Sequence, residues 1–204
     1  MAVSRIAEVI ASSTREILAE VCKGEEAPAF GSWVEVERED GTVLYALVSH
    51  AEVGSVEPGR QAVALGMDRA TLRTEMPQLA ELIRTTFRAQ VLAWWDGHTR
   101  RDGQPVLRQT LPPQPAGLHD PVVACGHETV AALGAPWDFL RTLARHPDPA
   151  VPADDLLVAV LSGVYRASGQ GEEGRRALLN AGRALSRLLD DDHERLQSIL
   201  RRVA

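Results

Sequence analysis

Hydrophobic periodicity changes part-way along the chain, and this change limits the folds open to it. Val34 and Val36 alternate with Glu35 and Glu37, which is the period-two signature of a half-buried strand. After Trp137, apolar residues recur instead at the three- and four-residue spacing of helices. The sequence therefore predicts an α+β protein in which strands come first and helices second.

The first half of the chain contains the strongest strand signals. Residues 34–48 predict a β-hairpin, because Asp40-Gly41 can adopt the positive φ of a tight turn and the run after it is apolar enough to be buried on both sides. Other apolar segments predict short strands: residues 6–10 and 17–21 (one long strand or two short ones), 61–66, 90–95 and 121–125. About six strands favour a small closed barrel, since closure removes exposed sheet edges.

One helix is expected within the β-rich half. Pro77 suits a first helical turn, where its missing N–H costs nothing. Leu79, Leu82, Ile83 and Phe87 then recur at helical spacing and predict one apolar stripe.

The C-terminal part predicts a helical bundle, and we place the domain boundary between residues 126 and 127. A short helix through Trp137 is ended by Pro147 and Pro149, and Asp154 is a candidate N-cap for the next helix. Further helical stripes follow at residues 157–164, 175–189 and 196–203. These helices are too short to persist alone, so they must pack on each other or on the barrel.

Composition indicates in which cellular compartment the protein resides and which class of partner it binds. The formal net charge is −6 and the arginines are spread along the chain, which disfavours nucleic acid as the partner. Cys22 and Cys125 are far apart without metal-ligand spacing, as expected of buried thiols in a reducing compartment. No segment approaches the roughly 18 apolar residues that span a bilayer. We therefore expect a soluble cytoplasmic protein.

Three motifs resemble catalytic or metal sites only superficially. Gly169 and Gly174 have the spacing of a phosphate loop, but Arg175 and Arg176 replace its Lys and Ser/Thr. His127-Glu128 lacks the second histidine of a zinc helix, and residues 190–192 lack the spaced oxygens of a calcium loop. The sequence predicts no enzyme, metal, nucleotide, cofactor or small-molecule substrate.

Two features favour recognition of another macromolecule. Trp94 and Trp95 are adjacent, so on a strand they point to opposite faces, and Arg100 and Arg101 follow closely. These four residues are the candidate partner-binding site, since exposed Trp is a common interface anchor; the alternative is that the helical region covers the second Trp. The segment at 111–115 is either a ligand for a proline-binding groove or a connector between strands, and the connector is favoured.

Taken in order, several segments resemble the HAS-barrel family, named for a small barrel shared by hexameric DNA-translocating ATPases and the catalytic-ring subunits of rotary ATP synthases. The N-terminal matches are AEVIASSTRE (7–16), PAFGSWV (28–34), YALV (45–48), PQL (77–79), RTTFRA (84–89), LPPQP (111–115) and VVAC (122–125). The C-terminal pieces WDFLRTL (137–143), AGRAL (181–185) and DDHERL (191–196) are similar to small free-standing bacterial members.

The resemblance implies a barrel that self-assembles or docks on a ring ATPase encoded elsewhere. In the larger relatives the barrel forms a collar at the entry of the ring, and their ATPase machinery lies in a domain that this chain lacks. We therefore expect a non-catalytic interaction module with a protein partner. The alternative is a nucleic-acid-associated accessory protein, for which Trp94, Trp95, Arg100, Arg101 and Arg108 form the only local cluster of aromatic and basic residues.

Overall fold

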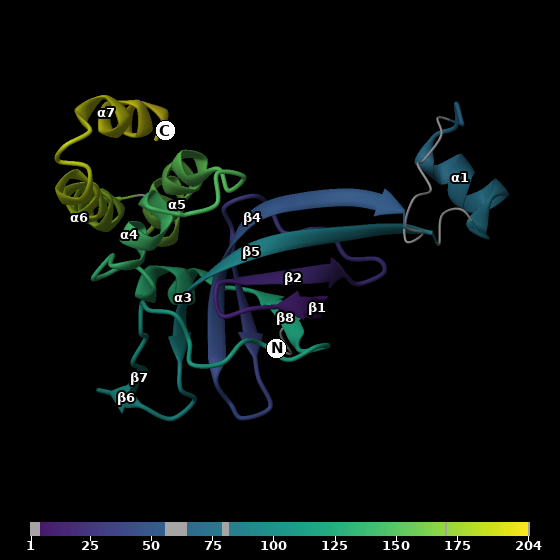
Figure 1. Cartoon of the computed structure of the whole chain (residues 1–204), viewed down its shortest axis with the longest axis horizontal. Coiled ribbons are helices and arrows are strands. Elements are labelled where there is room, and N and C mark those ends of the chain that lie inside the picture. Colours follow the sequence, from purple (N-terminus) through teal and green to yellow (C-terminus); the bar gives the residue numbers. More distant parts are fainter. Residues whose placement is uncertain (1–4, 56–64, 79–81, 170, 204) are drawn as a thin grey trace.

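The strands form a closed antiparallel barrel at the centre of the molecule (Figure 1). The computed structural model describes residues 5–55, 65–78, 82–169 and 171–203. Neighbouring strands follow the order β1-β2-β5-β4-β3-β8, and β8 closes the barrel by pairing with β1. Their bounds are β1 Arg5–Ser12, β2 Glu16–Val21, β3 Trp33–Glu37, β4 Val43–Ser55, β5 Ile83–Trp95 and β8 Pro121–Ala124. The α+β class and the N-terminal barrel are confirmed.

Two tight turns explain the local pairing of the first four strands. Gly41, between β3 and β4, has a φ of 80°, and Asp40 Oδ1 accepts a hydrogen bond from Thr42 N at 2.9 Å. The predicted hairpin over residues 34–48 is confirmed. Residues 6–21 form two strands, because Ser13 N donates to Glu16 O at 2.8 Å and turns the chain back between β1 and β2.

Mostly Ala and Val side chains, with Ile17, Leu44 and Phe87, fill the interior of the barrel. The narrow interior suits this choice, since small barrels are packed by side chains and hold no channel. The buried members are Ala7, Val9, Ile17, Ala19, Val34, Val36, Leu44, Ala46, Val48, Phe87, Ala89, Val91, Ala116 and Val122.

The helix predicted from Pro77 is confirmed at residues 77 and 78, which are helical, and is wrong from Ile83 onward. Ile83 and Phe87 lie in β5, where Phe87 pairs with Ala19 of β2 and Ile83 pairs with Ser55 of β4. Leu79 lies outside the described residues. Two neighbouring strands supply a complete hydrogen-bond ladder, and this tertiary pairing overrides a helical spacing of only a few residues.

A helix that the sequence did not predict lies just before this position. It is α1 (Arg69–Glu75), and Asp68 Oδ1 caps it by accepting from Thr71 N at 2.8 Å. Within the strand predicted at residues 61–66, residues 61–64 lie outside the described part, and Leu65 and Gly66 are not in a strand.

The segment between β5 and β8 forms a small hairpin and a proline-rich loop. The hairpin pairs β6 (Arg100–Arg101) with β7 (Gln104–Pro105). Residues 111–115 then run between β7 and β8, in the connecting position that the sequence favoured. Pro112 is buried there.

The C-terminal part consists of helices, which begin three residues after β8 ends. They are α3 (His127–Ala132), α4 (Phe139–Ala144), α5 (Ala153–Ala167), α6 (Glu172–Leu188) and α7 (His193–Arg202). Two predicted starts are corrected. Trp137 has a φ of 71° and precedes α4, and the N-cap of α5 is Pro152, so Asp154 sits in its first turn.

A second apolar core joins the helices to the outer wall of the barrel. Trp33, Tyr45, Leu47 and Leu92 leave the barrel strands on the outer side and pack with buried residues of the helices. Trp33 and Phe139 meet edge to face, with ring centres 5.3 Å apart. The helical part is thus packed on β3, β4 and β5. Figure 1 shows the helices beside the ends of β4 and β5 that lie away from α1.

A buried amide strengthens the connection between the barrel and the helices. The side chain of Gln90 on β5 donates to Glu16 Oε2 at 2.8 Å and to Ser49 Oγ at 3.1 Å. Its Oε1 lies 3.0 Å from His146 Nε2, in the loop after α4. The amide nitrogen and the carbonyl oxygen of the Gln90 side chain both have partners. These hydrogen bonds compensate for the cost of removing the amide from water.

Candidate functional site

The predicted tryptophan pair is divided between the two cores. Trp94 and Trp95 end β5, and both are half-buried. Trp94 packs against the barrel interior, whereas Trp95 packs against the core shared with the helices. The two rings therefore face opposite sides of the strand and do not form one aromatic surface.

Arginines already cover these rings. The Arg100 guanidinium lies 4.7 Å from the centre of the Trp95 ring, and the Arg108 guanidinium lies 4.9 Å from that of Trp94. The structure thus brings Arg100 to Trp95, while Trp94 is covered by Arg108. Arg101 lies beside Arg100 on β6 and is exposed.

Asp96 fixes the turn that follows the tryptophans. Its carboxylate accepts hydrogen bonds from Thr99 Oγ1 at 2.6 Å, Thr99 N at 2.7 Å and Arg108 Nη1 at 2.7 Å. The bonds from Thr99, with that from Arg108, hold the pKa of Asp96 well below its usual range. The charge of Arg108 is therefore used within the chain.

Three titratable side chains meet where β3, β4 and β8 approach the helices. Cys125 Sγ lies 4.0 Å from Glu35 Oε2, and Tyr45 is the cross-strand neighbour of Glu35. Burial, and next the charge of Glu37, raise the pKa of Glu35. Burial, and next the charge of Glu35, raise the pKa values of the Cys125 thiol and the Tyr45 hydroxyl. A nucleophilic cysteine needs a lowered pKa, so the environment of Cys125 is of the opposite kind.

The far end of the β4–β5 ribbon is the most exposed part of the strands. Trp33 pairs with Leu47, so β3 covers the outer edge of β4 only near its start, and a β-bulge at Ser49 follows. Beyond the bulge, residues 51–55 of β4 pair with residues 83–87 of β5. We call residues 51–55 and 83–85 the β4–β5 arm; it extends away from the barrel toward α1 (Figure 1).

One face of the β4–β5 arm carries two exposed apolar side chains. Val53 pairs with Thr85 and Ser55 pairs with Ile83, so Val53 and Ile83 are diagonal neighbours on the same face. Val53 is 62% exposed and Ile83 is 49% exposed. Neither was singled out from the sequence as a site residue. The available signal was the three β-branched residues Ile83, Thr85 and Thr86, which favour a strand.

The remaining motifs have structural surroundings. Gly169, with a φ of 90°, lies in the connection between α5 and α6, and Asp192 caps α7 by accepting from Arg195 N at 3.1 Å. The Cys22 and Cys125 thiols are free and partly buried. Among the described residues, no group of three or more His, Cys, Asp or Glu side chains is placed to hold a metal ion. No helix in those residues has the length and apolar character needed to cross a membrane.

Comparison with known proteins adds no relative. No protein-family model matches the chain, and no curated protein matches it.

Proposed function

We propose that this chain is a non-catalytic assembly module whose barrel docks on a ring ATPase through the β4–β5 arm. The observation that carries the proposal is the exposed apolar pair Val53 and Ile83, which share one face of strands that project from a packed barrel. Folding gains nothing from leaving such side chains in water, whereas a partner surface covers them.

The backbone of the arm supports the same proposal. Over residues 51–54, β4 pairs with β5, and Leu47 is the last residue of β4 that pairs with β3. Among the described residues, no strand pairs with the second edge of β4 over residues 51–54, and an extended segment of a partner can add there as a strand. The resemblance to HAS barrels makes a ring ATPase subunit the partner of choice.

The titratable groups with shifted pKa values also fit a structural role. The Asp96 carboxylate holds a turn, and the Cys125 thiol is kept protonated next to Glu35. These environments stabilise the resting protonation states of the two groups, whereas catalytic groups are tuned toward ionisation or proton transfer near neutral pH.

Co-elution tests the proposal directly. The purified chain is mixed with a barrel-bearing ring ATPase of the same host and analysed by size-exclusion chromatography with light scattering. The wild type is expected to co-elute with the ring, and the Val53→Asp/Ile83→Asp variant is expected to elute alone. Leu118→Asp is the matched control, because Leu118 is 66% exposed and lies outside the arm. A wild-type chain that stays monomeric at high concentration and binds no ring would refute the proposal.

The nucleic-acid alternative has weaker support. Its aromatic residues already stack on Arg100 and Arg108, and Arg108 is paired with Asp96. Stacking of bases would have to displace these contacts. Fluorescence anisotropy with a labelled oligo-dT tests it, and a steep fall of affinity with salt would favour this alternative over docking.

A further inference from the structure

An apolar groove runs between α6 and α7 on the outer side of the helical part. Its volume is about 530 Å³, and its lining residues are Arg175, Leu178, Leu179, Gly182, Arg183, Ser186, Leu200 and Val203. Leu179 is 61% exposed and Leu200 is 43% exposed. The α7 helix thus supplies one apolar wall, and α6 supplies the other wall together with two arginines.

The groove follows a single stripe of α6. Arg175, Leu179, Gly182 and Ser186 are spaced by four, three and four residues, so they lie on one face over about three turns. The small residues Gly182 and Ser186 leave room for the backbone of another helix to approach.

The two glycines of α6 have different surroundings. A Cβ at Gly174 would lie 2.8 Å from Tyr165 O, so close packing against α5 accounts for that glycine. A Cβ at Gly182 would meet nothing within 4 Å. Glycine is unfavourable inside a helix, and close packing against the described residues does not account for it at position 182.

The charges of the groove have a single sign. Arg175 and Arg183 are exposed and make no ion pair within the described residues, and no acidic residue lines the groove. This basic rim belongs to a chain with a formal net charge of −6. The complementary ligand therefore carries apolar side chains at its centre and carboxylates at its edges.

We propose that the groove between α6 and α7 binds an acidic amphipathic helix of a protein partner. A helix presents apolar residues at i, i+4, i+7 and i+11, which matches the stripe of α6, and its acidic flanks meet Arg175 and Arg183. A second copy of the chain fits less well, because a symmetric contact centred on Gly182 places the two Arg183 side chains together.

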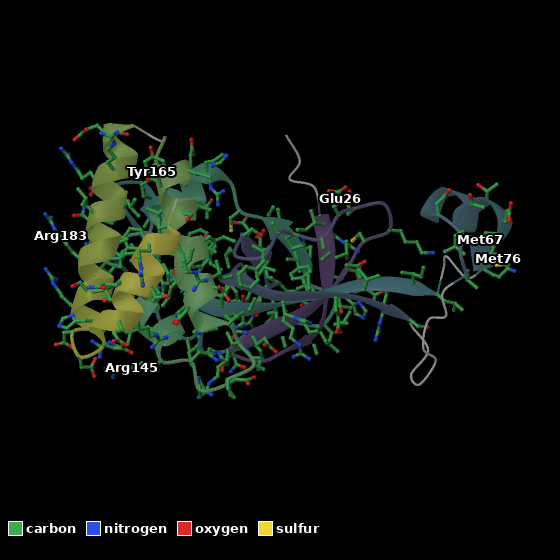
Figure 2. All side chains as sticks on the ribbon, turned by 90° about the horizontal axis from the view of Figure 1, so that it is seen from above. Glu26, Met67, Met76, Arg145, Tyr165 and Arg183 are labelled. Carbon is green, nitrogen blue, oxygen red and sulfur yellow. The ribbon has the colours of Figure 1, made fainter. Side chains whose placement is uncertain are left out.

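The proposed site is independent of the β4–β5 arm. Figure 2 shows Arg183 at one end of the molecule, whereas Met67 and Met76, which flank α1, lie at the other end. The two surfaces can therefore be occupied at the same time, and each can be removed without the other.

Designed peptides test the charge and the location together. The probe is a fluorescein-labelled helical peptide of about 18 residues, roughly five turns, with Leu at i, i+4, i+7 and i+11 and Glu at the flanking positions. The control peptide has Lys at every Glu position. Anisotropy titrations with the full chain are expected to give at least about tenfold tighter binding of the acidic peptide, which corresponds to about 1.4 kcal/mol.

Variants of α6 make the test specific. Leu179→Glu is expected to abolish binding of the acidic peptide, and Arg183→Glu is expected to reverse the preference toward the lysine peptide. Arg176→Glu is the matched control, since Arg176 is exposed on the same helix but does not line the groove. The Val53→Asp/Ile83→Asp variant is expected to bind the peptide as the wild type does. Circular dichroism and thermal melts show whether each variant is folded.

Several results would overturn the proposal. These are equal binding of both peptides, no binding of either, amide NMR shifts that fall outside α6 and α7, and an Arg183→Glu variant that keeps the wild-type preference. Dimerisation of the free chain that Leu179→Glu abolishes would assign the groove to a second copy instead. Binding to anionic phospholipid vesicles with the same dependence on Leu179 and Arg183 would assign it to a membrane surface. None of these outcomes depends on whether a ring ATPase co-elutes with the chain.

Discussion

The two ends of the β4–β5 ribbon have the same antiparallel ladder and opposite surroundings. Near the start of β4, residues 44–49 are all buried, with the barrel interior on one side and the helices on the other. Past the bulge at Ser49, residues 50–54 are all exposed. Backbone pairing is therefore common to both ends, and side-chain burial is what distinguishes them.

This difference divides the apolar residues of the strand pair into those that folding explains and those that it does not explain. The apolar residues of the buried end are explained by folding, because each contacts one of the two cores. Val53 and Ile83 at the exposed end lie outside both cores. The proposed docking contact would cover them.

The largest expected effect comes from truncating one residue at each end. Leu47→Ala should lower the free energy of unfolding by about 2–5 kcal/mol, because Leu47 is fully buried between the barrel and the helices. Val53→Ala should change it by less than about 0.5 kcal/mol, because Val53 is exposed. Urea unfolding followed by circular dichroism measures both values. Similar losses for the two variants would remove the distinction between the two ends.

A second test concerns the contact that fixes the helices to the buried end. Gly31 lies just before β3, has a φ of 74°, and a Cβ there would be 2.2 Å from Ala159 Cβ on α5. Gly31→Ala should therefore cost about 1–3 kcal/mol of stability. In a double-mutant cycle with Ala159→Gly, the two losses should not add, since the second change removes the collision. Additive losses would show that α5 does not pack against Gly31.

The two glycines of α6 offer a third test, in which we expect smaller changes in the free energy of unfolding. Gly174→Ala should destabilise the chain by about 1–3 kcal/mol, because its Cβ would collide with Tyr165 O. Gly182→Ala should stabilise it by about 0.5–1 kcal/mol, because alanine is the better helix former and the position is open. Thermal melts of both variants measure the pair. A loss of stability at position 182 would mean that the groove is filled in the free chain.

The smallest effect concerns charge at the buried end and depends on pH. The pKa of Glu35 is raised in the folded chain, so the native state holds this proton more tightly than the unfolded state, and stability is lost as pH rises through the folded pKa. Glu35→Gln should therefore gain stability relative to wild type at pH 7, but not at about pH 3.5. The gain should stay below about 1 kcal/mol, since the side chain is partly exposed.

Urea unfolding at the two pH values measures this effect, with Glu39→Gln as the control. Glu39 is exposed in the turn between β3 and β4. A Glu35→Gln variant whose stability relative to wild type is the same at both pH values would contradict the burial of this carboxyl group.

Local patterns were sufficient to predict the barrel, the β3–β4 hairpin and most of the helices. Asp40-Gly41 specifies its turn chemically, and the stripe at residues 157–164 specifies the buried face of α5. The assignment of Ile83 and Phe87 failed because their environment is set by β2 and β4, which are distant in the sequence. The β4–β5 arm was missed for the same reason, since its exposure depends on where β3 ends.

For the predicted recognition residues, the sequence likewise predicted the direction of the side chains but not their contacts. Adjacent tryptophans on a strand must face opposite sides, and Trp94 and Trp95 do. Arg100 and Arg108 cover the two rings because of the β6–β7 hairpin and the hydrogen bonds of Asp96. The spacing of residues in the sequence predicts neither of these features.

Site-specific photo-crosslinking tests most directly whether the arm is the docking surface. The photoreactive residue p-benzoylphenylalanine is placed at Val53 in one sample and at Leu118 in another, and each is irradiated with the barrel-bearing ring ATPase of the same host. Both positions are exposed to a similar degree, at 62% and 66%. The account predicts a crosslink to the ATPase subunit from position 53 and none from position 118. Equal crosslinking from both positions, or crosslinking from position 118 alone, would contradict it.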